Sequence, residues 1–456
     1  MPVESLPTRA AWTAYAVAQA PRQRHAPFRS PAALERTQRR GVRRVVAHAY
    51  EHVPYYRETM RRLGLGPHDF AGAADLAKLP LIEREELQRD PEYFVSTARP
   101  IERYVQLATD GTTGVPITVY HDPFALFRGA THSERREATV FRLAGRRFRL
   151  RRVFVGSRMG TLARTSRAFR HRSLIPAGLR YSDLHLSMRE PPAKNAERIS
   201  AFRADFMHAY GSYVEALFTH LHRSGTPFHA PKVVVYGADG VSEPMRRLIA
   251  EKFGVALLSE YGAGEAHHVA LECERHGGLH LNVDLYPLRI VDPEGRELAD
   301  GNSGEVVVSN LVNRATVLLN YRLGDRATKL RGPCPCGRTL PLLSFPEGRI
   351  DDWVASPSGE PVHAQEVRGL ILADDRWVLA FQIEQLSPSR FKVAAVAAEG
   401  ADRDALRTRI QGRFAERFGE RTSTEVSFVD SLVRTPGGKV RVVSARHSHA
   451  PPPVVP

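Results

Sequence analysis

The segment TDGTTG is rich in groups that bind phosphate. Three hydroxyl side chains and two glycines fall within six residues, between two strand-like segments. Glycines let backbone N–H groups approach a phosphate closely, and threonine hydroxyls add further donors. A plain hairpin turn would use the same residue types. On its own, the segment therefore indicates only a candidate phosphate loop, made of Thr109, Asp110, Gly111, Thr112, Thr113 and Gly114.

Further segments have the residue types that an ATP-dependent reaction of a carboxylic acid requires. They are VVVYGADG, SEYGAGEA, YRLGDRA, EGRIDDWV and RTPGGKVR. Bringing a carboxylate to the α-phosphate of ATP places two anions together, so the site must supply cations and hydrogen-bond donors. Lysine is scarce in the chain, seven against 58 arginines (65 minus 7). The lysine in RTPGGKVR is therefore informative, because a compact ammonium on a glycine turn can reach into a site.

In their order along the chain, these segments resemble the motifs of the adenylate-forming enzyme superfamily, most closely its phenylacetate–coenzyme A ligase branch. The resemblance covers about residues 35–445. It comprises the phosphate loop, an aromatic-Gly-x-x-Glu motif, Tyr-Arg-x-Gly-Asp, Gly-Arg-x-Asp-Asp and a C-terminal Gly-Lys loop. It implies an enzyme that uses ATP to convert a carboxylic acid, aryl or arylacetic, into an acyl-adenylate. The acyl group then passes to a thiol, coenzyme A, with release of AMP and pyrophosphate.

The resemblance also implies a role for each matched residue. Glu265 would help to bind Mg²⁺, which prefers carboxylate and phosphate oxygens, and Asp325 would accept hydrogen bonds from the ribose hydroxyls. Lys439 would contact the reacting carboxylate and the α-phosphate, and Asp351 would be the hinge between two domain orientations. In the phosphate loop, Asp110 stands where the family usually has a small residue. Outside that loop, the residues that would contact the nucleotide are Gly237, Ala238, Asp239, Tyr261, Gly262 and Arg349. The acid pocket would include Tyr236, Ala263, Ala266 and His267.

Alternating strand and helix patterns must position these residues. RRVFVGS, DFMHAYGS and PKVVVYGADG are strand-like, and helical patterns follow two of them. Such alternation predicts an α/β fold with mostly parallel sheets, in which ligands lie at the carboxyl ends of the strands. A β-rich subdomain is expected over about 281–330. We expect a large adenylation domain over 1–350, a small mobile α+β domain over 351–446 and a disordered tail over 447–456.

All three cysteines lie in two short segments, ECERHGGLH and GPCPCGR. Cys273, Cys334 and Cys336 with one histidine would complete a tetrahedral Cys₃His set, the donor set of a closed structural zinc site. Unliganded thiols in turns are the alternative. The fourth ligand is either His280 or His276, and the resemblance favours His280 because the family has a similar Gly-Leu-His.

Composition and charge argue against a membrane protein, a secreted protein and a nucleic-acid-binding protein. The chain has 456 residues, 42% hydrophobic and 25% charged, and it lacks both an apolar run of membrane-spanning length and a secretory signal. A cytoplasmic location without membrane contact is expected. The net charge of +15 would also suit nucleic acid, but the arginines are dispersed and no nucleic-acid-binding motif is present.

Two alternative functions stay open. One is an adenylating enzyme whose acceptor is an amine or a carrier-protein thiol, and the other is a nucleotide- or nucleic-acid-binding protein without ligase activity. The sequence also leaves open the identity of the acid and whether the protein is a homodimer.

Overall fold

The computed structural model describes residues 5–108, 117–146, 148–156, 167, 169–176, 179–349, 353–359, 361–372, 377–433 and 440–445. The chain divides into two compact units. The first comprises Met1–Leu150, Ser157–Asp183 and Leu258–Phe345, and the second comprises Arg151–Gly156, Leu184–Leu257 and Pro346–Pro456. Each unit therefore contains segments that are distant in sequence.

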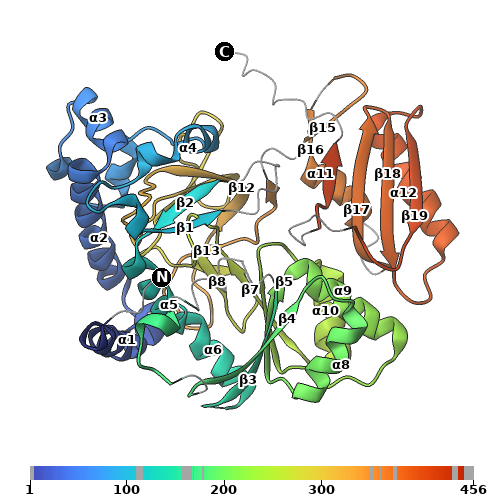
Figure 1. Cartoon of the computed structure of the whole chain (residues 1–456). Coiled ribbons are helices and arrows are strands. Elements are labelled where there is room, and N and C mark those ends of the chain that lie inside the picture. The colour runs from blue at the N-terminus through green and yellow to red at the C-terminus, as the bar shows by residue number, and fades with distance from the viewer. Residues whose placement is uncertain are drawn as a thin grey trace. The chain divides into compact units, whose positions relative to one another are not determined.

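The first unit begins with long helices that cover one side of its strands (Figure 1). Helix α2 starts at Ser30, whose side chain accepts a hydrogen bond from the backbone N–H of Ala33, and its apolar residues recur every three or four positions to face the core. The principal helices of this unit are α1 (Leu6–His25), α2 (Pro31–His52), α3 (Pro54–Arg62), α4 (Arg84–Arg89), α5 (Pro123–His132) and α6 (Glu134–Ala144).

The strands of the first unit form an antiparallel array in the order β10-β11-β12-β13-β9-β8-β7. Their alternating buried side chains pack against α2 and α3 in one core that includes Val46, Tyr56 and Ile290. Strands β10, β11 and β12 lie in or at the edge of the region 281–330 that the sequence predicts to be β-rich, and β7, β8 and β13 lie outside it. Its strands are β7 (Ala256–Tyr261), β8 (Ala270–Glu272), β9 (Leu279–Leu281), β10 (Leu288–Val291), β11 (Ser303–Val308), β12 (Tyr321–Leu330) and β13 (Leu342–Leu343), and a separate pair is formed by β1 (Val105–Ala108) and β2 (Thr118–His121).

The second unit contains the parallel part of the fold. Strands β3, β5 and β6 pair in parallel, and β6 is an apolar run buried on both faces, as expected of a central parallel strand. Helices α9 and α10 each end at a glycine in the left-handed conformation, Gly225 and Gly254. The elements of this part are β3 (Leu150–Gly156), β4 (Tyr181–Ser187), α8 (Pro192–Phe202), β5 (Phe206–Tyr210), α9 (Gly211–Ser224), β6 (Val233–Gly237) and α10 (Glu243–Phe253).

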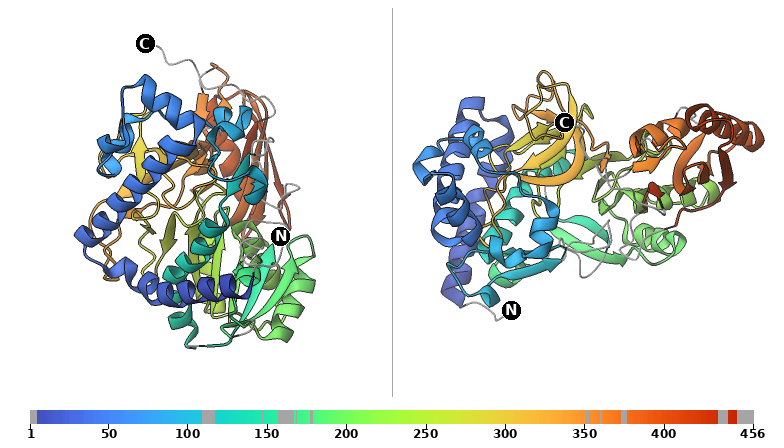
Figure 2. Two further views of the ribbon diagram at one scale, coloured as in Figure 1. Left: turned by 60° about the vertical axis from the view of Figure 1, so that its left-hand side comes forward. Right: turned by 90° about the horizontal axis from the view of Figure 1, so that it is seen from above.

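The C-terminal residues of the second unit form a smaller α+β sheet in the order β19-β18-β17-β20. Helix α12 covers one face of it (Figure 2), and Phe391 packs against Phe414 and Phe418 in its core. Its strands are β17 (Val378–Ser387), β18 (Arg390–Ala397), β19 (Ser423–Phe428) and β20 (Val443–Ala445), and its helices are α11 (Ala364–Leu372) and α12 (Arg403–Phe418). Strands β15 (Trp353–Ala355) and β16 (Pro361–His363) form a separate antiparallel pair, and the short strand β14 (Gly348–Arg349) precedes them outside this sheet.

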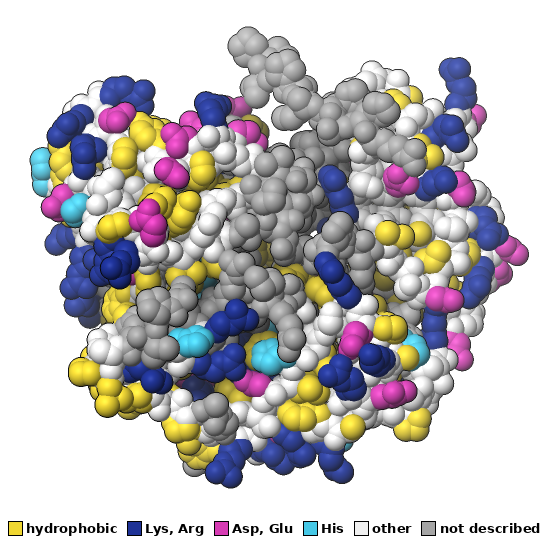
Figure 3. All heavy atoms as spheres, in the orientation of Figure 1, with side chains coloured by type: hydrophobic (Ala, Val, Ile, Leu, Met, Phe, Trp, Pro, Cys, Tyr) yellow, Lys and Arg dark blue, Asp and Glu magenta, His cyan; other side chains and the backbone are white. Residues whose placement is uncertain are grey.

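These elements confirm the α/β fold class, with a parallel sheet and a C-terminal α+β region. Among the described residues, no helix is both long and apolar enough to cross a bilayer. On the face drawn in Figure 3, Lys and Arg side chains are spread over both units and alternate with Asp and Glu. The positive charge is therefore not gathered into one patch on that face.

Candidate active site and candidate metal centre

Residues 261–267, here called the 261–267 loop, begin with Tyr261, the last residue of β7, continue toward β8 and contain Glu265. This loop is tightly closed, because the backbone N–H groups of Ala263 and Ala266 donate to each other's carbonyl oxygens at 2.8 and 3.1 Å. A Cβ atom at Gly262 would lie 2.1 Å from the carbonyl oxygen of His267, so only glycine fits there. The glycine at position 262 is thus required by the backbone path of the loop.

The loop meets strand β12, which carries the Tyr-Arg-x-Gly-Asp segment. The Tyr261 hydroxyl donates to Asp325 Oδ2 at 2.8 Å, and the Tyr321 hydroxyl donates to Glu265 Oε1 at 3.2 Å. Gly324, immediately before Asp325, has φ +73°, a conformation that favours glycine. Two motifs that are about 60 residues apart in sequence are therefore joined by hydrogen bonds between their own side chains.

Two histidines lie beside this loop. His121 Nε2 is 3.1 Å from the carbonyl oxygen of Gly264, and its ring stacks on that of His267 with centroids 4.7 Å apart. Burial lowers the pKa of His121 to about 4, and burial with the neighbouring His121 lowers the pKa of His267. Both imidazoles are therefore neutral at pH 7. The pocket role of His267, Ala263 and Ala266 stays a prediction.

In the second unit, the segment Tyr236–Asp239 lies at the carboxyl end of β6. Ala238 has φ +70°, and Asp239 Oδ1 accepts a hydrogen bond from the backbone N–H of Ser212 at 3.1 Å, at the start of α9. The Tyr236 hydroxyl is 2.5 Å from Arg246 Nη1. The turn thus lies where ligands of parallel sheets bind.

Several expected site residues lie outside the described residues: Thr109, Asp110, Gly111, Thr112, Thr113, Gly114, Asp351 and Lys439. Arg349 lies in β14, but its side chain is also outside the description. Their roles stay predictions of the sequence.

The cysteines converge with one histidine in the first unit. The ligand atoms of Cys273, His280, Cys334 and Cys336 all lie within 4.8 Å of one another. Cys273 Sγ is 3.7 Å from Cys334 Sγ, and Cys336 Sγ is 3.3 Å from His280 Nε2. In a tetrahedral zinc site with Zn–S bonds of about 2.3 Å, adjacent ligand atoms are about 3.5–3.8 Å apart. The Cys273–Cys334 and Cys336–His280 distances are close to this spacing, and the set has the donor types of a structural zinc site.

The surroundings act differently on the ligand forms of these side chains. The backbone N–H groups of Arg275 and Arg338 approach Cys273 Sγ and Cys336 Sγ, each at 3.4 Å. Burial lowers the pKa of His280 to about 4, which keeps it neutral, whereas burial raises the pKa of Cys273 to about 12. A thiolate at Cys273 thus requires a cation beside it.

His276, the alternative fourth ligand, is not a member of this cluster. Its Nδ1 lies 2.7 Å from Glu272 Oε1, and the Glu272 side chain is fully buried. The preference for His280 agrees with this arrangement.

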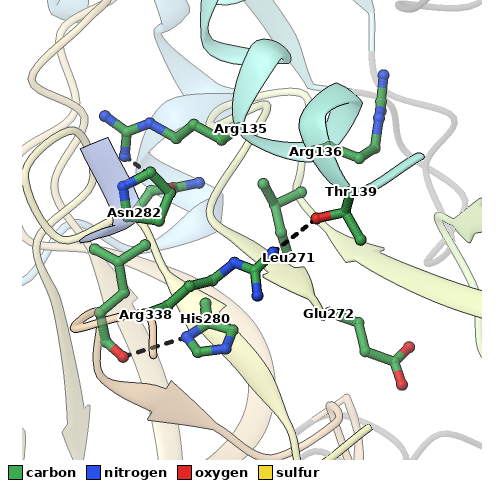
Figure 4. A pocket seen from close by; sticks show the side chains of 10 residues that line it. Arg135, Arg136, Thr139, Leu271, Glu272, His280, Asn282 and Arg338 are labelled. Carbon is green, nitrogen blue, oxygen red and sulfur yellow. Dashed lines mark hydrogen bonds between the residues drawn. The ribbon is translucent and has the colours of Figure 1, made fainter. Parts of the chain in front are cut away.

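A small cavity of about 10 Å³ adjoins the cluster (Figure 4). Arg135, Arg136 and Thr139 of α6 line it on one side, and His280 and Arg338 line it on the other. Arg338 Nη2 donates to Thr139 Oγ1 at 2.8 Å across this space. The volume suits one water molecule, so the cavity is not a substrate pocket.

Comparison with known proteins identifies the family. Residues 354–446 match the CapK C-terminal domain. The phenylacetate-coenzyme A ligase of Escherichia coli (strain K12) is 30% identical over 332 residues, which cover 70% of this chain and 72% of that protein. The protein of the same name from Thermus thermophilus is 29% identical over 371 residues, 77% of this chain and 78% of that protein.

The chain belongs to the phenylacetate–coenzyme A ligase family. The family resemblance seen in the sequence is thereby confirmed. Among solved structures, a 2-hydroxyisobutyryl-CoA ligase in the postadenylation state with R3-HIB-AMP superposes with a TM-score of 0.74, over 93% of this chain and 91% of that one, at 18% identity. At this identity the likeness supports the fold alone.

The sequence did not indicate several residues that surround the family motifs. Glu134, Arg135, Arg136 and Glu137 are all buried at the start of α6, although a run of charges in a helix is usually solvent-exposed. Glu260, just before the 261–267 loop, contacts Arg136, and His268, just after it, contacts Glu260. The run ERRE that follows an apolar helix does not by itself indicate that its charges are buried.

Proposed function

We propose that this protein is an AMP-forming acid–coenzyme A ligase for an aryl or arylacetic acid. ATP-dependent activation of a carboxylic acid, followed by transfer to coenzyme A, is the activity of an enzyme of this family. The aromatic class of the acid is our inference from the small residues Ala263 and Ala266 beside His267, which leave room for a ring. The contribution of Tyr236 to this pocket stays a prediction from the sequence.

The hydrogen bonds between the 261–267 loop and β12 carry the proposal. They bring together Tyr261, which would lie against adenine, and Asp325, which would accept the ribose hydroxyls. Glu265, bonded to Tyr321, would contribute to Mg²⁺ binding beside the phosphates. Gly237, Ala238 and Asp239 would meet the base edge, and Lys439 would stabilise the negative charge of the reacting carboxylate and α-phosphate.

Zinc is proposed as a resident structural ion. Cys273, His280, Cys334 and Cys336 would bind it, and the S···S and S···N distances support this assignment. A Cys₃His set leaves no open position, so the ion would stabilise the fold and take no part in the chemistry.

The small C-terminal domain, 351–446, is proposed to rotate about Asp351 between the two half-reactions, as the family resemblance implies. A cytoplasmic location and a homodimer stay predictions.

Pyrophosphate exchange across a panel of carboxylic acids tests the proposal. We expect exchange with aryl or arylacetic acids, and a thioester as the product when coenzyme A is added. If amides form from amines while coenzyme A is not acylated, coenzyme A is not the acyl acceptor and that part of the proposal is wrong. If ATP binds but no acid supports exchange, the ligase function itself is wrong.

A further inference from the structure

The two ends of the 261–267 loop are held by buried charged side chains. Glu260 directly precedes the loop and His268 directly follows it. His268 Nδ1 donates to Glu260 Oε1 at 2.5 Å, and both side chains are about nine-tenths buried. Arg136 of α6 donates to the other oxygen of Glu260, Oε2. The Glu260 carboxylate thus accepts one hydrogen bond from Arg136 and one from His268, and so links the two ends of the loop.

Arg135, next to Arg136 in α6, is linked to His268 at the end of the loop through the side-chain amide of Asn282. Arg135 donates to Asn282 Oδ1 at 2.7 Å, and Asn282 Nδ2 donates to the carbonyl oxygen of His268 at 2.8 Å. Arg135 is itself fixed by a bidentate pair with Asp284 at 2.8 and 2.7 Å. Two consecutive arginines of α6 therefore hold His268 indirectly. Arg136 acts on its ring through Glu260, and Arg135 acts on its carbonyl oxygen through Asn282.

We propose that Arg136, Glu260 and His268 form a positioning clamp for the reaction: by fixing the ends of the 261–267 loop, they place Tyr261 and Glu265 for ATP. The proposal rests on the proposed function, because it assigns these two residues to the nucleotide. The clamp residues act through the loop and do not touch the substrate.

Stability alone does not explain this network. Buried ion pairs are often no more stabilising than well-packed apolar residues of similar volume. What they provide is a fixed geometry, because each carboxylate and guanidinium accepts only a few directions of approach. Because Gly262, Ala263 and Gly264 have little or no side chain with which to pack, contacts at the loop ends add to the backbone hydrogen bonds between Ala263 and Ala266. A shift of about 1 Å in a positioned group can lower a rate about 100-fold.

Three variants of the full-length protein test the clamp. His268→Leu removes the N–H donor at similar volume, and His268→Gln restores a donor. His132→Leu is the matched control, because His132 is also a buried histidine in the first unit and its Nδ1 has no hydrogen-bond partner among the described residues. Calorimetric titration with MgATP measures Kd, and thermal unfolding measures Tm for each variant.

We expect His268→Leu to weaken MgATP binding by about 10- to 100-fold, the range for losing a charge-assisted hydrogen bond. His268→Gln should recover to within about threefold of wild type, and His132→Leu should stay within about twofold even if its Tm falls equally. The clamp is overturned if His268→Leu binds like wild type, or if His132→Leu weakens binding as much.

The same measurements separate the clamp from the ligase function. If the wild-type protein binds MgATP and only His268→Leu binds it more weakly, the clamp is supported. If, in addition, no acid drives pyrophosphate exchange, the proposed reaction is wrong while the clamp still holds. Wild type that binds no MgATP overturns both.

Discussion

Removing zinc from the Cys273–His280–Cys334–Cys336 cluster should lower the stability of the first unit substantially. The ion would join Cys273 to Cys334 across 61 residues of chain and His280 to Cys336 across 56. Treated as one covalent cross-link over such a loop, the loss of chain entropy in the unfolded state amounts to about 4 kcal/mol. With an unfolding entropy of about 2.1 cal/mol/K per residue, a unit of this size changes its Tm by about 2 °C per kcal/mol, so a fall of roughly 7 °C is expected.

The assay pairs metal analysis with thermal unfolding. Protein dialysed against a mild chelator is analysed for zinc, and its Tm is compared before and after a strong chelator. His280→Gln removes one ligand, whereas His276→Gln changes a histidine four residues away that is bonded to Glu272. We expect His276→Gln to retain zinc and the chelator-dependent Tm shift, and His280→Gln to lose both.

Two results would refute this reasoning. Wild-type protein with less than about 0.3 equivalents of zinc after the mild dialysis would show that the cluster does not retain the ion, since structural sites bind zinc with large free energies. Equal zinc loss in the two histidine variants would show that the ligand set is wrong.

Three substitutions test the nucleotide site and the hinge. Asp325→Ala removes two charge-assisted hydrogen bonds to ribose, each worth about 1.5–3 kcal/mol, so the KM for ATP should rise at least tenfold; a change within about twofold contradicts the assignment. Lys439→Ala should lower pyrophosphate exchange by about 10²–10³-fold while thioester formation from a supplied acyl-adenylate persists, and near wild-type exchange would exclude its role. Asp351→Pro should fix one backbone orientation and spare one half-reaction; equal loss of both in a folded variant would argue against domain rotation.

Short segments of sequence were sufficient to locate the family motifs. The roles of Tyr261, Glu265 and Asp325 were predicted because short segments resemble family motifs, and these roles stay predictions. Gly262 and Gly324 have conformational reasons for being glycine in the structure. The metal ligands were also indicated, because three cysteines in a chain of 456 residues are rare enough that their clustering carries information.

The choice between His276 and His280 needed the fold. Both histidines lie within a few residues of Cys273, and spacing does not distinguish them. Pairing of β13 with β9 brings His280 opposite Leu342 and so beside the turn that contains Cys334 and Cys336. His276 instead contacts Glu272.

The clamp at the 261–267 loop was decided by tertiary structure alone. Arg135 and Arg136 read as an exposed stretch of helix, because hydrophobicity patterns assume that charges face water. Their partners Asp284 and Glu260 are distant in sequence, and only the packing of α6 against β7 and the residues after β9 brings the charges together. A buried charge is tolerated only where opposite charges and donors surround it in three dimensions, so the sequence of α6 alone could not indicate it.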